Sequence, residues 1–143
     1  MAPAVLVAAL SVAALASASA AASPAQDYML YCMGCHGEQA RGVPGKVPPL
    51  AGALALYMRS EAGRNYVLRV PGAANSALSD AQLAAVLNWL AQTYPAPGEA
   101  RAAAFTAEEV ARTRHTPLAN VQATRQELVR ALGATGNAPA PEY

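Results

Sequence analysis

Residues 32–36 read Cys-Met-Gly-Cys-His, and this short stretch decides the fold that we expect for the 143-residue chain. In a helical turn, residues three and four positions apart lie on one face. Cys32, Cys35 and His36 therefore present two thiols and one imidazole on the same side. The spacing is that of covalent c-type haem attachment, C-x-x-C-H. It predicts that the two cysteines form thioethers with one haem and that His36 is the proximal ligand of its iron.

Other kinds of site also use paired cysteines. A structural zinc site needs four ligands, commonly with a second pair of thiols or imidazoles at short spacing. The chain has only two cysteines, and its second histidine is the distant His115. A thioredoxin-like redox pair follows a strand in a βαβ unit, whereas a helical run precedes this motif and a loop follows it. We therefore favour haem over zinc, a redox pair or a structural disulfide.

Residues 1–22 carry no charged side chain and are typical of a secretory signal peptide. An apolar run from Val5 to Leu15 is followed by Ala18-Ser19-Ala20, an A-x-A cleavage site. No Lys or Arg precedes the run, which departs from the usual pattern. An uncleaved anchor is the alternative, because about 20 apolar residues span a bilayer. We expect cleavage and a mature protein that is soluble in the periplasm, where haem is normally attached through thioethers.

The composition describes one small domain with few charges. Ten basic and nine acidic residues give a net charge of +1, and only one of the basic residues is lysine. The sequence contains no basic run and no aromatic platform, which excludes nucleic acid as a partner. The low net charge also argues against docking by strong electrostatic steering.

A loop rich in glycine and proline follows the motif over residues 37–50 and ends in Pro48-Pro49-Leu50. In this arrangement the chain resembles the class I c-type cytochromes, in which a glycine-rich loop and a Pro-x-Leu sequence follow the motif histidine. The resemblance implies a small all-α, cytochrome c-like fold around one covalent haem c. It also implies that the Pro48 carbonyl accepts a hydrogen bond from His36 Nδ1–H and that Leu50 packs on the proximal side of the haem.

A well-marked helix is expected from Ser79 to Tyr94. Ser79 and Gln82 form a capping box at its start, and Pro95 ends it. Apolar residues recur with helical spacing at positions 83, 86, 87 and 90. This helix resembles the last core helix of the class I family, and the resemblance implies an aromatic contact between Tyr28 and Trp89.

Two further helices are expected in the core. One runs over residues 26–35 and the other, after a short turn, fills most of residues 51–70. Arg59, Arg64 and Arg69 are spread around the second helix, so we expect them to be solvated. Binding of the haem propionates is the alternative for any one of them.

The second axial ligand is where the sequence departs from the family. The family places a methionine before a proline in the loop that precedes the last core helix, and here Val70 stands before Pro71. Met58 is the candidate that we predict in its place, because its thioether would give the His/Met ligation of an electron carrier. Filling the core is the alternative role for Met58. His115, Asn75, an open or water-bound site, and a ligand from a partner remain as other possibilities.

Residues 95–143 form a linker and a helical C-terminal extension. Thr106 and Glu109 predict a capping box for a helix that ends near His115, and a second helix is expected over residues 119–132. Neither helix can bury its apolar side chains alone. The extension either packs back on the core or docks on a dehydrogenase subunit.

These features predict a periplasmic electron carrier, with the haem domain at residues 23–94. The chain would accept electrons from a periplasmic dehydrogenase and pass them to a later cytochrome or an oxidase, as a free shuttle or as a subunit. It would not itself be an enzyme, because the haem carries the chemistry and the protein supplies ligands and a docking face. The alternative is a haem-based gas-binding or sensing module with an open distal site.

Overall fold

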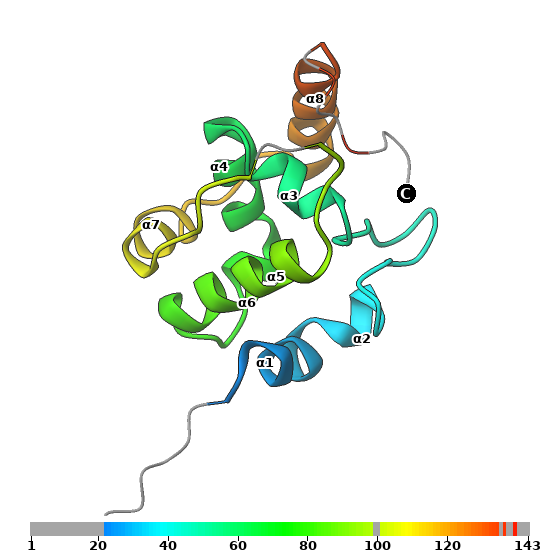
Figure 1. Ribbon diagram of the computed structural model, residues 1–143. Helices are drawn as coiled ribbons and strands as arrows, with labels where there is room; N and C mark the ends of the chain where they lie inside the picture. Colours follow the sequence, from blue (N-terminus) through cyan, green and yellow to red (C-terminus); the bar gives the residue numbers. More distant parts are fainter. Residues whose placement is uncertain (1–21, 99–100, 135, 137–138, 140–143) are drawn as a thin grey trace, which may run out of the picture.

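The computed structural model describes residues 22–98, 101–134, 136 and 139, so nearly all of the expected signal peptide lies outside the described residues. The described part is all-α, as predicted, and its only β pairing is a single bridge between Val43 and Val47. None of its helices is both long and apolar enough to cross a bilayer. Its eight helices (Figure 1) are α1 Pro24–Tyr31, α2 Met33–His36, α3 Ala53–Tyr57, α4 Glu61–Arg69, α5 Pro71–Ala74, α6 Asp80–Thr93, α7 Ala107–Thr113 and α8 Val121–Gly133.

Two segments that we expected to be single helices are each divided. Cys32, with φ −125° and ψ −36°, separates α1 from α2. In the second segment Ser60 is extended, and its hydroxyl caps α4 by accepting a hydrogen bond from Gly63 N at 3.0 Å. Serine favours such a cap because its short side chain satisfies an amide that has no partner within the helix. The predicted single helix over residues 51–70 is therefore wrong in detail.

Gly63 is required by the close approach of α3 and α4. A Cβ at this position would overlap the carbonyl oxygen of Tyr57 and lie 2.9 Å from Ser60 Oγ. The residue is buried, so neither helix can move outward without opening the core. Glycine weakens an isolated helix, but here it allows two helices to contact each other.

Replacing Gly63 with alanine should therefore destabilise the holoprotein by about 1–3 kcal/mol, as overpacking of a tight core does. The free energy of unfolding in guanidinium measures this. Gly72→Ala is the matched control, because Gly72 lies in α5 and a Cβ there would meet nothing within 4 Å. Equal stability of the two variants would show that the α3–α4 contact tolerates a methyl group.

The centre of the fold is α6, and α1 packs across it. The predicted capping box is present at Ser79 and Gln82, and the four apolar residues of the predicted stripe are all buried. The Tyr28 and Trp89 rings are 5.6 Å apart at 46°, which confirms the expected aromatic contact. Asp27, also buried, accepts a hydrogen bond from Gln82 Nε2 at 3.3 Å. An aromatic pair and a polar contact therefore fix α1 on α6.

The C-terminal extension packs back on the core. Helix α7 contacts α6 and α4, and α8 contacts α4, as Figure 1 shows. The extension buries Phe105 and Val110 at the start of α7. Asn88 of α6 holds the same segment through both of its polar atoms, since Nδ2 donates to Phe105 O at 2.9 Å and Oδ1 accepts from Phe105 N at 2.8 Å. The first of the two arrangements that we considered is therefore observed.

The prediction that Arg59 and Arg69 are solvated is wrong. Arg59 Nη2 donates to the Pro97 carbonyl at 2.9 Å. Arg69 donates to the carbonyls of Thr116 and Pro117 at 2.6 and 2.8 Å. Arg59 lies between α3 and α4 and Arg69 ends α4, and both side chains bind the backbone of the extension.

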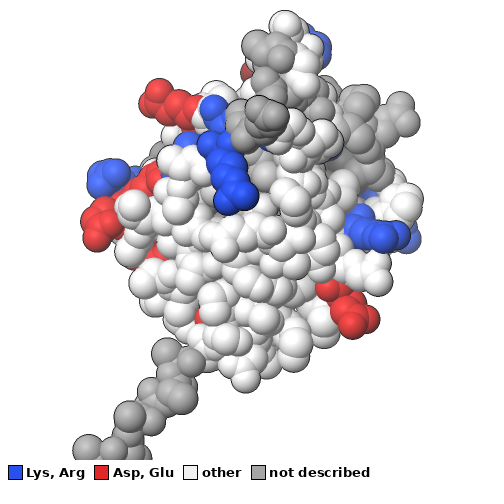
Figure 2. All heavy atoms as spheres, viewed as in Figure 1, with Lys and Arg blue, Asp and Glu red and all other residues white. Residues whose placement is uncertain are grey.

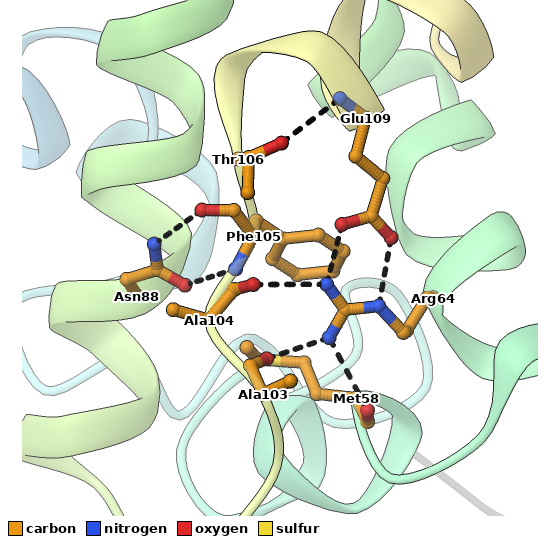
Figure 3. Close-up of polar contacts among 8 residues, drawn as sticks. All are labelled: Met58, Arg64, Asn88, Ala103, Ala104, Phe105, Thr106 and Glu109. Atoms are coloured by element: carbon orange, nitrogen blue, oxygen red, sulfur yellow. Dashed lines mark hydrogen bonds and ion pairs between the residues drawn. The ribbon is translucent and has the colours of Figure 1, made fainter.

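Arg64, also expected to be solvated, makes the most extensive of these contacts (Figure 3). Its guanidinium pairs with both carboxylate oxygens of Glu109, at 2.7 and 2.5 Å. It also donates to the carbonyls of Ala103 and Ala104, and it lies 4.2 Å from the centre of the Phe105 ring. Arg64 therefore joins α4 to the extension through charge, hydrogen bonds and an aromatic face.

This contact also corrects the predicted capping box of α7. Thr106 Oγ1 accepts a hydrogen bond from Glu109 N at 3.2 Å, as expected for the cap. The Glu109 carboxylate, however, binds Arg64 of another helix. A tertiary ion pair has thus replaced the local half of the capping box.

Candidate haem site

The motif lies on the single turn of α2. The amides of Cys35 and His36 both donate to the Cys32 carbonyl, at 3.2 and 3.0 Å. The backbone is therefore helical between Cys32 and His36, as the C-x-x-C-H spacing predicted. Both cysteines are free thiols; Cys32 is half-buried and Cys35 is exposed. Two thiols and one imidazole thus come from one turn near the surface, where a large planar group can reach them.

His36 is oriented by the loop that follows it. Its Nδ1 lies 3.0 Å from the Pro48 carbonyl oxygen. A carbonyl only accepts, so Nδ1 carries the proton, and Nε2 keeps its lone pair for a metal. Such a hydrogen bond fixes the ring and strengthens the imidazole as a donor. The contact that the family resemblance implied is present, and the bond between His36 and iron stays a prediction.

Gly42 gives this loop its shape, a role that the sequence analysis missed. Gly42 N donates to the His36 carbonyl at 2.8 Å, and its φ is +67°. A Cβ there would overlap the Val47 carbonyl oxygen and lie 2.7 Å from that of Pro48. The loop therefore closes over residue 42 and presents Pro48 to His36 only because no side chain intervenes.

Hydrogen bonds of Leu50 and Tyr28 also stabilise this loop. Leu50 N donates to the carbonyl of buried Ala40 at 2.8 Å, and its half-buried side chain packs against the core. The Tyr28 hydroxyl donates to the Gly37 carbonyl at 2.5 Å. Burial, with smaller effects from Cys32 and Tyr94, raises the pKa of Tyr28 to about 12, so the hydroxyl keeps its proton. Tyr28 thus ties α1 to the residue after His36 as well as packing on α6.

Burial also sets the protonation of the motif side chains. It lowers the pKa of His36 below its usual 6.5, against an opposing effect of the Pro48 hydrogen bond, so the imidazole is neutral at pH 7. Burial, followed by the charges of Asp27 and Cys35, raises the pKa of the Cys32 thiol. A neutral imidazole is the form that binds a metal.

The donor set fits haem better than a bare metal ion. Two free thiols at three-residue spacing and a neutral imidazole of fixed tautomer are the groups that covalent haem attachment uses. In the described part of the chain, no group of three or more His, Cys, Asp and Glu side chains could hold a metal ion.

Met58 lies in a different environment from His36. Its side chain is 4% exposed and lines a cavity together with Asn88 of α6 and with Ala102 and Ala104 of the extension. Figure 3 shows its backbone carbonyl, like that of Ala103, facing the guanidinium of Arg64. These contacts agree with the alternative that Met58 fills the core. They do not test its reach to an iron, so ligation by Met58 stays a prediction beside the alternative of an open sixth position.

The other candidates for that ligand lie at the surface. His115 is exposed just beyond α7, where its Nε2 accepts a hydrogen bond from Arg114 at 3.3 Å. Asn75 is exposed at the end of α5. Val70, which stands where the family has a methionine, is the half-buried cap between α4 and α5. Of these three residues only His115 carries a usual iron ligand, and it is exposed.

Comparison with known proteins agrees with the site. Residues 24–94 match the family model described as cytochrome c. Two relatives, both named cytochrome c-552 and both from Thermus thermophilus, are 35% identical over 121 residues, which covers 68% of this chain. The match covers 90% of the length of one relative and 80% of the length of the other. The matched share of the chain is larger than residues 24–94, so the similarity is not confined to the haem domain.

Proposed function

The chain belongs to the cytochrome c family, and from this premise we propose that it is a periplasmic carrier of single electrons. The family establishes the coarser function, which is electron transfer through covalently attached haem c. Cys32 and Cys35 would hold the haem through thioethers, and His36 would bind its iron, with Pro48 and Leu50 on the same side. The observation that carries this assignment is the 3.0 Å contact between His36 Nδ1 and Pro48 O beside two free thiols.

The haem supplies one-electron chemistry when it is bound, and the chain supplies its environment. Pro48 keeps Nε2 of His36 available, and Gly42 permits that contact. Tyr28 ties the start of the loop to α1, and the hydrogen bond from Leu50 N to the Ala40 carbonyl closes the loop on itself. No residue has to gain or lose a proton for an electron to pass, which is consistent with a carrier and not an enzyme.

The periplasmic location and the partners are also proposed. The uncharged N-terminal run with its A-x-A site supports export. A periplasmic dehydrogenase would be the donor and a later cytochrome or an oxidase the acceptor, with the chain acting as a free shuttle or as a dehydrogenase subunit. One face of the molecule carries almost no charge over α6 (Figure 2). Docking there would depend on shape and apolar contact more than on long-range attraction.

Removing both thiols tests the assignment. In the exported Cys32→Ala/Cys35→Ala variant, haem should be lost completely on denaturing gels and in acidified acetone extraction, whereas the unmodified protein should keep it. The unmodified holoprotein should titrate as a single one-electron couple. Met33→Leu is the control, because Met33 lies in the same turn but supplies no thiol. Covalent haem in the double variant, or no reversible couple in the unmodified protein, would contradict the proposal.

A further inference from the structure

We propose that this chain leaves the sixth coordination position of its haem iron without a side-chain ligand, so that the isolated holoprotein binds a small uncharged diatomic molecule there. The inference rests on the proposed function, because it assumes that His36 is the proximal ligand. It goes further by assigning a second, ligand-binding property to the same iron.

The set of possible donors is small. Methionine sulfur and histidine nitrogen are the usual second ligands in electron-transfer haem proteins. The chain has four methionines and two histidines. Apart from Met1 in the expected signal peptide, all of them lie among the described residues. Beyond His36, the donors are Met29, Met33, Met58 and His115.

Met29 and Met33 lie on the wrong side. Met33 stands between the two cysteines on the turn that also carries His36, and Met29 lies in the last turn of α1, 54% exposed. The sixth ligand has to approach from the face of the haem opposite His36. A side chain rooted in the same turn as the thioethers and the proximal imidazole would have to pass around the edge of the ring.

Met58 is held against the extension. Asn88 and Trp89 are consecutive in α6 and point in different directions: Trp89 contacts Tyr28 of α1, and Asn88 binds the extension at Phe105. Met58 shares its cavity with Asn88. Its backbone carbonyl, in addition, is 3.5 Å from Arg64 Nη1, the guanidinium that binds the extension. To turn away from the extension, the Met58 side chain would have to leave a buried position.

His115 lies at the opposite end of α6 from the His36 loop. Its neighbour Arg114 donates to the Leu78 carbonyl and pairs with Asp80, the first residue of α6. The loop that ends in Leu50 continues to Gly52, whose amide donates to the carbonyl of Tyr94 at the other end of α6. The 14 residues of α6 separate these ends by about 21 Å. His115 is therefore remote from the region in which Pro48 orients His36.

The segment between α4 and α6 offers no replacement. Residues 70–79 read Val-Pro-Gly-Ala-Ala-Asn-Ser-Ala-Leu-Ser and contain no sulfur, imidazole or amine. Asn75, its one amide, is exposed. With the described methionines and His115 placed elsewhere, the sixth position is accessible to a ligand from solution. A neutral diatomic molecule needs no charged side chain beside it, and residues 70–79 carry none.

Carbon monoxide is the probe for the reduced, isolated holoprotein. The oxidised protein should give a high-spin absorption spectrum, and the reduced protein should bind carbon monoxide stoichiometrically, at a rate that increases linearly with its concentration. Met58→Ala and His115→Ala should change the affinity for carbon monoxide by less than about twofold. Met33→Leu serves as the control for a methionine change near the haem.

Other results would contradict either this inference or the proposed function, and the two cases can be told apart. A weak long-wavelength methionine–iron(III) band, together with no binding of carbon monoxide, would overturn the inference. Loss of that band in Met58→Ala would identify Met58 as the ligand, and a change to a high-spin spectrum in His115→Ala would identify His115. In either case the haem would still be covalent and redox-active, so the proposed function would stand. Absence of covalent haem would instead contradict the proposed function itself.

Discussion

Replacing Gly42 with alanine is expected to destabilise the holoprotein by about 2–4 kcal/mol and to raise its midpoint potential. A side chain at φ +67° costs about 1–2 kcal/mol, and the overlap with the carbonyls of Val47 and Pro48 adds a further overpacking cost. Moving the Pro48 carbonyl weakens its hydrogen bond to His36. A weaker imidazole donor stabilises the oxidised iron less, so the potential should rise.

Gly52 provides the matched control for this prediction. It also has a positive φ, +73°, but a Cβ there would meet nothing within 4 Å. Gly52→Ala should therefore show only the backbone cost and leave the potential unchanged. Guanidinium unfolding and a spectroscopic redox titration measure the two effects. If the two variants behave alike, the packing of Gly42 against Pro48 does not control His36.

The second large effect is expected at Arg64. Arg64→Ala removes a bidentate ion pair with Glu109 and the donors to two carbonyls, and it leaves the partly buried carboxylate without its partner. Removing one member of such a pair costs several kcal/mol when it is buried. With side chains 15% and 25% exposed, we expect a loss of about 2–4 kcal/mol in the free energy of unfolding.

Arg112→Ala is the control for Arg64, because Arg112 is an exposed arginine of α7 and its loss should cost less than about 0.5 kcal/mol. A double-mutant cycle with Glu109→Gln isolates the pair. A coupling energy near zero, or equal losses for Arg64→Ala and Arg112→Ala, would show that the extension is held by its apolar contacts alone.

The parts of the fold that were predicted correctly depend on local patterns. The capping box at Ser79 and the apolar stripe of α6 are both written within a few residues of the chain, and the motif at residues 32–36 needs only its own turn. The extension helices also follow from such patterns. Local physics is sufficient here because each pattern and the tertiary structure agree.

The contacts that sequence reasoning missed join distant parts of the chain. Arg64 and Arg69 bind backbone carbonyls 39 to 48 residues away, and a carbonyl is present at every position, so no residue type marks the acceptor. No local pattern marks Gly42 or Gly63 as required. Their requirement arises from a neighbouring backbone that the sequence does not place.

The candidate site also combines residues that local spacing identifies with residues whose placement depends on distant parts of the chain. Cys32, Cys35 and His36 were identified from spacing, and the Pro48 contact followed from the resemblance to a family. Met58 was proposed because it is one of few sulfur donors, and its packing depends on α6 and the extension, which lie far along the chain. The type of donor limits which residues could bind the iron. Where each of these side chains points, however, is determined by tertiary contacts.

The way in which the extension is fastened has a consequence for sequence variation. The acceptors for the core arginines are backbone carbonyls, at residues 97, 103, 104, 116 and 117. A substitution at one of these positions changes the side chain but leaves the carbonyl in place. Substitutions in the linker can therefore accumulate with little loss of stability. The arginines that supply the hydrogen-bond donors, in contrast, cannot be replaced without losing the attachment. Related chains could keep this attachment with little identity in the linker, provided that its path and those arginines are retained.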